Sequence, residues 1–361
     1  MILDQEQQLL QKTVNEFAEK EIDPVSQRIE KEGISQDLIK KAAQAGFLGA
    51  SIPQEYGGSG LDEKGYMILL RGLAGHSASL AFYIFMHDSI LRSVFAMKGA
   101  EEKAKKTLPA IAAGDMSAGV AFEDLFKNID KTGLSIEGSS KATGSKSFVF
   151  NPHGNFMLVV AKSGQEDWLL SVDNGYSISS KVRKLGLRAV DFSAVSFDSK
   201  ISDSDVILKS GGLEALQNIY DMAGFHAAAI ALGIAGSALS KAVSYSKMRK
   251  AFESTLLEFQ PLAFQLEEKS AELSRLEDAL FSLDDFKDKK KAIDYKIAAL
   301  DFARSASKLS LQIHGGYGYL EDFQIERYYR DSMMLTALTS NYIKDRIKTS
   351  NLGFDAPNAK Y

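Results

Sequence analysis

The sequence of 361 residues contains no cysteine, so disulfides, thiolate nucleophiles and cysteine metal ligands are excluded. Basic residues are not in excess: 43 Lys and Arg face 47 Asp and Glu, and the net charge of −4 argues against a nucleic-acid binder. The five histidines show no metal-ligand spacing and no acidic partner at short range. We see no run of the roughly 20 apolar residues that a membrane span needs, and the opening residues lack the pattern of a signal peptide. We therefore expect a cytoplasmic protein with no metal.

The patterns that are present come in the order helices, strands, helices. Helical periodicity dominates the first 115 residues, interrupted by a loop with proline and glycines at 52–61. From 116 to about 206 the segments are short and rich in β-branched and aromatic residues, which is typical of strands. Long alanine-rich or amphipathic segments then return, and 222–248 is expected to be one helix. Segregated runs of this kind predict an α+β protein, mostly α, with domains at 1–115, 116–210 and 211–361.

Five motifs follow one another along the chain. They are Ile52-Pro53…Tyr56-Gly57-Gly58…Gly60; Gly99-Ala100-Glu101-Glu102-Lys103 with Leu108-Pro109 and Gly114-Asp115; Lys184-Leu185-Gly186-Leu187-Arg188 with Phe197-Asp198; Arg249-Lys250-Ala251-Phe252 with Gln260; and Gln312-Ile313-His314-Gly315-Gly316-Tyr317-Gly318-Tyr319 with Glu326-Arg327-Tyr328-Tyr329-Arg330-Asp331. In this order they resemble the acyl-CoA dehydrogenase family. The resemblance implies an N-terminal helical domain, a middle β-barrel or sandwich domain and a C-terminal four-helix bundle.

The resemblance also implies a cofactor and partners. The family binds FAD non-covalently, acts on acyl-CoA-type thioesters and passes electrons to an electron-transfer flavoprotein. Its flavin lies between the β-domain and the bundle, and the pyrophosphate and adenine reach the neighbouring subunit. We therefore expect FAD and an oligomer, which would be a homodimer, a homotetramer or a heteromer with a second family member.

The bundle motifs supply the predicted cofactor-binding residues. The resemblance assigns this role to Arg249, Phe252, Gln260, Gln312, Gly315, Gly316 and Asn341. An arginine offers a fork of donors to a pyrophosphate, and consecutive glycines let backbone N–H groups approach an anion. The simpler interpretation of each residue alone is a solvated arginine and a glycine that ends a helix.

The catalytic base of the family is missing. Dehydrogenation needs a carboxylate beside the flavin to remove the α-proton, and the family position that usually holds this glutamate is Thr339 here. The alternative family position on the preceding long helix is Ala223. Asp221 matches an acid that often binds substrate in the family, but the arginine that usually follows it is Gly224. His226 is a substitute base by hypothesis, because histidine titrates near neutral pH.

The β-domain departs from the family pattern as well. The segment that usually reads Thr-Glu-Pro before a glycine-rich loop is Phe122–Asn128, which has no glycine, serine or threonine. The strand that usually reads Trp-Ile-Thr-Asn is Phe148-Val149-Phe150-Asn151. The side of the site that would hold the flavin ring is therefore altered, whereas the bundle side is retained.

We expect the first of three functions at the level of the family, and two alternatives stay open. The first is α,β-dehydrogenation of an acyl-CoA or related thioester by an FAD-dependent enzyme. The second is a non-catalytic subunit of a heteromeric acyl-CoA dehydrogenase, which lends its bundle motifs to the FAD of its partner. The third is a flavin monooxygenase-like reaction on the same fold, which rests on analogy alone.

Overall fold

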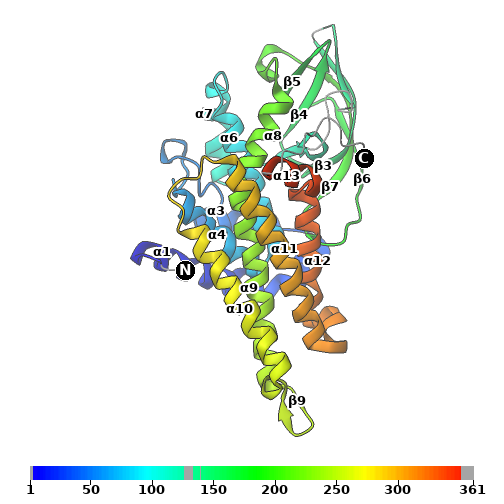
Figure 1. Cartoon of the computed structure of the whole chain (residues 1–361). Helices are drawn as coiled ribbons and strands as arrows, with labels where there is room; N and C mark the ends of the chain where they lie inside the picture. Colours follow the sequence, from blue (N-terminus) through cyan, green and yellow to red (C-terminus); the bar gives the residue numbers. More distant parts are fainter. Residues whose placement is uncertain (1–2, 126–132, 139, 351–361) are drawn as a thin grey trace.

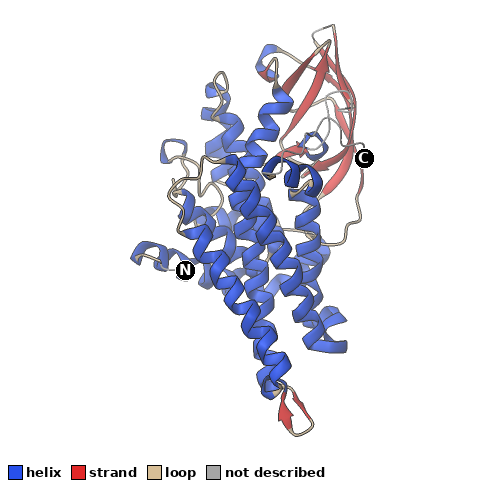
Figure 2. Ribbon diagram, in the orientation of Figure 1, coloured by secondary structure: helices blue, strands red, loops and turns tan. Residues whose placement is uncertain are grey.

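The computed structural model describes residues 3–125, 133–138 and 140–350. Helices form an elongated body, and a sheet lies against one end of it (Figures 1 and 2). The chain passes from the N-terminal helices into the sheet and returns to the body as a bundle of long helices, as the order of patterns predicts. The acyl-CoA dehydrogenase-like fold class is confirmed by the structural relatives described below. The exact domain boundaries remain a prediction.

The N-terminal region consists of helices that surround a buried hairpin. Its helices are α1 (Gln5–Phe17), α2 (Ser26–Glu32), α3 (Gln36–Gln44), α4 (Glu63–His76), α5 (Ala78–Phe85), α6 (Arg92–Phe95) and α7 (Glu101–Ala112). A π-helical turn, η4 (Met86–Leu91), joins α5 to α6. The side chains of Asp4 and Asp62 accept hydrogen bonds from the first turns of α1 and α4, which satisfies backbone N–H groups there. The α4–α5 hairpin is buried because its residues are apolar on nearly every face.

The middle region is a strongly bent sheet. Its strands are β1 (Ala118–Ala121), β2 (Leu134–Glu137), β3 (Lys141–Phe150), β4 (Phe156–Ser163), β5 (Glu166–Val172), β6 (Tyr176–Lys181), β7 (Phe192–Lys200) and β8 (Val206–Leu208). The order is β6-β7-β3-β1-β4-β5-β8, and β2 also pairs with both β3 and β4. At one end of β3 and β4 the strand between them is β1, and at the other end it is β2.

A buried ion pair holds the sheet interior together. Lys146 Nζ donates to Asp124 Oδ1 at 2.6 Å and to the carbonyl of Val160 at 2.7 Å, while the N–H of Val160 donates to Asp124 Oδ2 at 2.9 Å. Both charged side chains are 0% exposed. Each charge therefore has its partner and its hydrogen bonds, which is the condition under which buried charges are tolerated.

The C-terminal region is the predicted helical bundle. Its elements are α8 (Gly212–Met222), α9 (Gly224–Met248), a hairpin of β9 (Lys250–Ala251) and β10 (Ser254–Thr255), α10 (Gln260–Phe281), α11 (Lys289–His314), α12 (Ile325–Thr339) and α13 (Tyr342–Thr349). The expected single helix over 222–248 is confirmed as α9, which begins two residues later because Ala223, with a ψ of 3°, ends α8. Helix α9 packs against α4, α10, α11 and α12.

Helix α9 is also long and apolar enough to cross a membrane, which the sequence-based expectation of no such segment missed. However, 67% of its most apolar window is buried inside the protein, which is the pattern of a central bundle helix. Its neighbours supply the apolar surroundings that lipid would otherwise supply.

Candidate cofactor and substrate site

Thr339 lies at the end of α12 and its hydroxyl is used within the helix. The side chain is 1% exposed, and Oγ1 donates to the carbonyl of Leu335 at 2.7 Å. The next helix begins after it, and Asn341 Oδ1 accepts from the N–H of Lys344 at 3.3 Å as the cap of α13. The hydroxyl of Thr339 is therefore buried and hydrogen-bonded within α12. The described contact of Asn341 caps α13.

Aromatic rings fill the junction between the sheet and the helices. Phe122 follows β1, Phe148 and Phe150 come from β3, and Phe192 begins β7. Phe148 stacks on Phe192 at 4.3 Å with 15° between the planes, and Phe122 meets Phe192 edge-on at 5.6 Å. Phe150 contacts the same ring at 5.9 Å. We call this group, with the helical rings below, the aromatic cluster.

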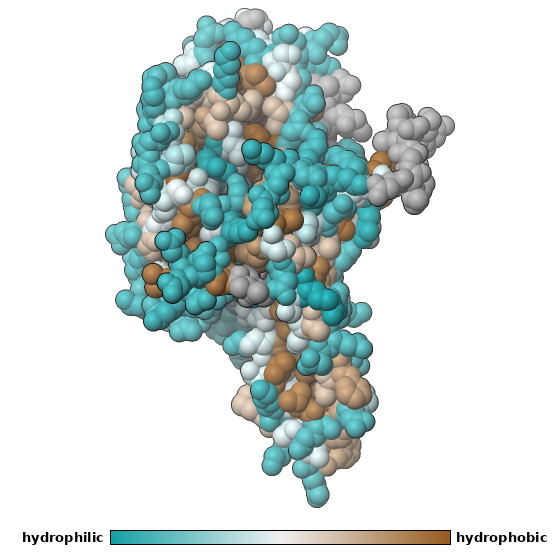
Figure 3. All heavy atoms as spheres, turned by 60° about the vertical axis from the view of Figure 1, so that its left-hand side comes forward, coloured by the Kyte–Doolittle hydropathy of each residue, from teal (hydrophilic) through white to brown (hydrophobic). Residues whose placement is uncertain are grey.

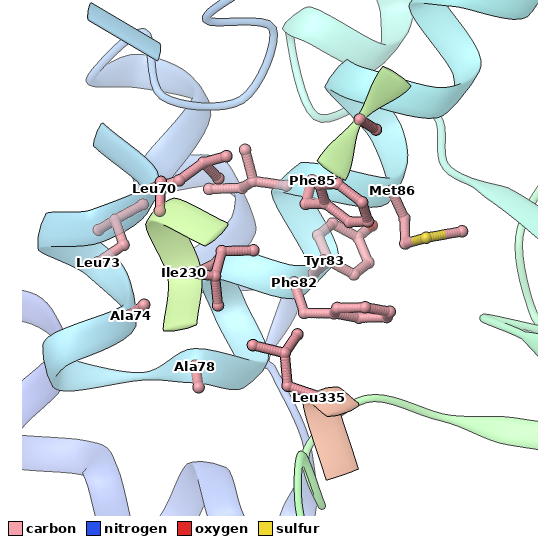
Figure 4. Close-up of a cluster of buried hydrophobic side chains, with 14 of the residues drawn as sticks. Leu70, Leu73, Ala74, Ala78, Phe82, Tyr83, Phe85, Met86, Ile230 and Leu335 are labelled. Atoms are coloured by element: carbon pink, nitrogen blue, oxygen red, sulfur yellow. The ribbon is translucent and has the colours of Figure 1, made fainter. Parts of the chain in front are cut away.

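The helices complete the aromatic cluster from the other side. Phe82 of α5 contacts Phe122 at 6.2 Å and Phe150 at 6.0 Å, and Tyr220 of α8 meets Phe122 at 5.8 Å. The hydroxyl of Tyr220 donates to the carbonyl of Leu338, next to Thr339. Figure 4 shows Leu335 of α12 beside the ring of Phe82 of α5. The cluster therefore lies where the segments 122–125 and 148–151 meet the position of the missing base. Phe126–Asn128, the rest of the altered segment, lie outside the described residues.

Burial sets the protonation state of His87, the histidine of this region. His87 is 0% exposed, its Nδ1 lies 2.8 Å from the carbonyl of Tyr83, and its Nε2 accepts from the N–H of Ala118 at 3.1 Å. The Nδ1 atom therefore carries the proton. Burial lowers the pKa of His87 to about 4, only partly opposed by the bond to Tyr83. The ring is thus neutral and acts as a fixed bridge between α5 and β1.

The substrate-side residues expected from the sequence are occupied by helix packing. Asp221 is 7% exposed and Oδ2 accepts from Lys348 Nζ of α13 at 2.6 Å. A Cβ atom on Gly224 would lie 2.5 Å from the carbonyl oxygen of Ala292 in α11, so the arginine that is usual here has no room. The close approach of α9 and α11 therefore explains why position 224 is glycine.

The far end of the bundle brings the retained motifs together. Arg249 follows the last residue of α9 and is exposed, and Gly315 and Gly316 follow α11. They line one groove of about 490 Å³ together with Tyr245, Leu256 and Tyr317, among others. Gly315 has a φ of 57°, a conformation that glycine adopts without strain. The side chain of Arg249 and the exposed glycines thus border one concave surface.

The other predicted bundle residues surround this groove. Phe252 lies at the turn of the β9–β10 hairpin and is 94% exposed, with a φ of 49°. Gln260 begins α10 and Gln312 lies in the last turn of α11, and both are exposed. His314 is buried, as expected for a packing residue, and stacks on Tyr245 at 4.3 Å.

Apolar side chains are exposed around the groove. Of the ten large hydrophobic residues that are exposed in the described chain, seven belong to this end: Met248, Phe252, Phe264, Tyr317, Tyr319, Leu320 and Phe323. Figure 3 shows brown and tan side chains gathered on the lobe that projects from the body, which is the bundle end. We call this surface the bundle end. A contiguous apolar surface of this kind marks an interaction site.

Comparison with known proteins gives the family. The model of the acyl-CoA dehydrogenase N-terminal domain matches residues 4–115, and that of the C-terminal domain matches 210–339. The chain belongs to the acyl-CoA dehydrogenase family. It is 27% identical to the 3-(aryl)acrylate reductase of Clostridium sporogenes over 98% of this chain and 100% of that one. It is 26% identical to the caffeyl-CoA reductase–Etf complex subunit CarC of Acetobacterium woodii, covering 93% and 95%.

A solved structure supports the fold. The glutaryl-CoA dehydrogenase of Mycobacterium smegmatis in complex with FADH2 superposes with a TM-score of 0.87 at 20% identity, over 96% of this chain and 94% of that one. Acyl-CoA dehydrogenases are FAD-dependent oxidoreductases, so the expected cofactor is confirmed for the family.

The described residues of the present chain fit one part of FAD and not the other. The bundle end offers the guanidinium of Arg249 to a pyrophosphate, and Gly315 and Gly316 leave open space beside it. At the sheet, a flavin ring would have to displace Phe150 and Phe192, which are both 0% exposed and in ring contact. The aromatic cluster therefore does not fit an isoalloxazine.

His226, the hypothetical substitute base, lies apart from the aromatic cluster. Its Nε2 is 2.6 Å from Glu63 Oε2, and its ring packs edge-on against Tyr66. Glu63 comes from α4, 163 residues earlier in the chain, so inspection of short-range neighbours could not find it. The sequence signal for the aromatic cluster was the phenylalanine at position 150, where the family has threonine.

Proposed function

We propose that this chain is a non-catalytic subunit of a heteromeric acyl-CoA dehydrogenase. Its bundle end would bind the pyrophosphate and adenine portion of an FAD whose ring lies in a second family member. The observation that carries the proposal is the aromatic cluster at the junction of sheet and helices, in which the rings of Phe82, Phe150 and Phe192 are fully buried. A subunit with this core has no room there for its own flavin ring.

Two features of the catalytic positions support the proposal. Neither Thr339 nor Ala223 carries a carboxylate, and the hydroxyl of Thr339 is bonded to its own helix. A hydroxyl does not act as a general base near neutral pH, because its pKa is far from that range. The chain therefore lacks the proton acceptor at both family positions.

The bundle end supports the other half of the proposal. Arg249 is exposed beside two glycines and within a rim of apolar side chains such as Phe252 and Tyr319. Arginine, methionine and aromatic residues are the types enriched at protein interfaces, and Arg249, Met248, Phe252 and Tyr319 are all exposed at the bundle end. The expected partner is therefore a second acyl-CoA dehydrogenase family member that retains the glutamate, together with an electron-transfer flavoprotein, in the cytoplasm.

The relatives suggest the substrate class of the assembly. They include a reductase of 3-arylacrylates and a subunit of a caffeyl-CoA reductase–Etf complex. Both substrates are α,β-unsaturated acyl compounds, and dehydrogenation of an acyl thioester is the reverse of such a reduction. We propose an acyl thioester as the substrate of the complete assembly.

The first test is the visible absorption of the purified chain, alone and co-expressed with a family member encoded nearby that keeps the glutamate. We expect a colourless chain alone, even with added FAD, and a flavin band in the co-purified complex. A flavin band in the chain alone that is bleached by an acyl-CoA would refute the proposal in favour of a self-sufficient dehydrogenase. Oxygen consumption by that coloured chain after reduction would indicate a monooxygenase instead.

The contribution of the bundle end is tested within the same complex. Arg249→Gln should reduce the flavin content per complex at least several-fold, because it removes the charged fork from the pyrophosphate. Arg275→Gln, on an exposed part of α10, is the matched control and should leave the flavin content unchanged. Equal flavin content in the two variants would show that the bundle end of this chain does not reach FAD.

A further inference from the structure

A separate cavity of about 400 Å³ lies beside His226, and we call it the His226 pocket. It lies on another face of α8 from the aromatic cluster. Ile219, Met222 and Ala223, the second family position of the base, line the pocket. Tyr220 instead points into the aromatic cluster, and Asp221 is bonded to α13. Successive helix residues are about 100° apart around the axis. Different faces of the same turn of α8 therefore border the two sites. The volume is within the range of small-molecule sites.

The back of the His226 pocket is a fixed hydrogen-bonded pair. His226 is 6% exposed, and its Nε2 lies 2.6 Å from Glu63 Oε2. Burial acts to raise the pKa of Glu63, but the hydrogen bond and charge of His226 and the charge of Arg92 outweigh it and the pKa is lowered. Glu63 is therefore ionised and accepts the proton of Nε2. The other ring nitrogen, Nδ1, has no hydrogen-bond partner.

Arg92 stands beside this pair with donors to spare. Its Nη2 approaches Glu63 Oε1 only to 3.8 Å, and its Nε has no hydrogen-bond partner although that atom is buried. A guanidinium presents Nε and Nη as a planar fork that matches the two oxygens of a carboxylate. Since Glu63 is already held by His226, Arg92 retains unused capacity for an anion.

The remaining walls of the His226 pocket are largely apolar. Phe225 and Phe286 meet edge-on with ring centroids 5.3 Å apart, and Ile219 and Met222 extend the same surface. Lys287, next to Phe286 on the connection between α10 and α11, adds a second positive charge at an exposed position. The pocket thus has an apolar side and a polar side, where Arg92 and Lys287 lie beside the Glu63–His226 pair.

We propose that the His226 pocket binds a small carboxylate with an apolar body. The carboxylate would lie against Arg92, with Lys287 nearby, and the body would pack on Phe225 and Phe286. The proposal does not depend on the function of the bundle end or on the presence of flavin. It assigns His226 to a binding pocket and gives it no part in proton removal.

The test is calorimetric titration of the purified chain with three compounds of equal chain length: hexanoate, hexan-1-ol and hexylamine. We expect hexanoate to bind at least tenfold more tightly than hexan-1-ol and hexylamine not to bind, because only the carboxylate uses the fork of Arg92. The comparison needs no mutation, so it holds even if a variant fails to fold. Equal binding of the acid and the alcohol, or no binding of hexanoate at millimolar concentration, would overturn the proposal.

Variants then locate the bound compound. Arg92→Gln should weaken hexanoate at least tenfold, and Arg92→Lys should weaken it less because the charge is kept. Arg275→Gln is the control, and its affinity for hexanoate should match that of the unmodified chain. Unchanged affinity in a folded Arg92→Gln variant would place the carboxylate elsewhere and overturn the assignment.

Discussion

Replacing Phe150 with alanine distinguishes a permanently packed core from a flavin site whose aromatic rings can move aside. The ring is 0% exposed and lies with centroid distances of 5.8 to 6.1 Å from Phe82, Tyr83, His87 and Phe192. Truncation of a buried phenylalanine costs about 3–5 kcal/mol, because transfer energy is lost and a cavity remains. Ring pairs add roughly 0.5–1.5 kcal/mol each beyond area burial. We therefore expect a loss in the upper half of that range.

The assay is urea unfolding of the isolated chain, followed by circular dichroism with and without added FAD. The matched control is Phe264→Ala, since Phe264 is 63% exposed and its truncation should change the unfolding free energy by no more than about 0.5 kcal/mol. The reasoning fails if Phe150→Ala costs less than about 1 kcal/mol while FAD raises the stability of the unmodified chain. That combination would mean that the rings move aside for a flavin.

Three further outcomes follow from the described contacts. Thr339→Glu should not create acyl-CoA-dependent reduction of an artificial acceptor, because the position is buried; turnover by this variant would contradict the closed site. Lys146→Met should lower stability by about 3–5 kcal/mol by leaving Asp124 unpaired, and the double variant Lys146→Met/Asp124→Leu should recover much of it in thermal melts. His87 resists protonation between pH 6.5 and about 4 while the unfolded chain binds a proton, so stability falls as the pH falls through this window. His87→Gln should remove about 3 kcal/mol of that pH dependence, and an identical pH profile in the variant would refute the assignment.

The sequence predicted the fold where local patterns agree with tertiary contacts. Strands β3, β4, β5 and β7 contain the β-branched and aromatic runs that indicate strands. Strand β6, with the sequence Tyr-Ser-Ile-Ser-Ser-Lys, contains no such run, because it is largely exposed and is stabilised by pairing with β7. Its residues carry little of the apolar signal on which a sequence-based prediction depends.

Contacts between distant segments limited the prediction of the site. Arg249 and Gly315 end two neighbouring helices of one bundle, so motifs sufficed to associate them. The aromatic cluster joins residues from 82 to 220, and only the fold shows that Phe150 and Phe192 fill one space. Likewise, the glycine at 224 could be read as a lost arginine, but the reason, contact with Ala292, lies 68 positions further along the chain.

The exposed bundle end has a consequence for how the protein is produced in the cell. Phe252 is 94% exposed at a hairpin turn, so without its partner the chain exposes an aggregation-prone apolar surface. Surplus copies would associate with one another or be removed by chaperones and proteases. Balanced synthesis of the two chains, as from adjacent genes on one transcript, would keep this surface covered from the moment that each chain folds.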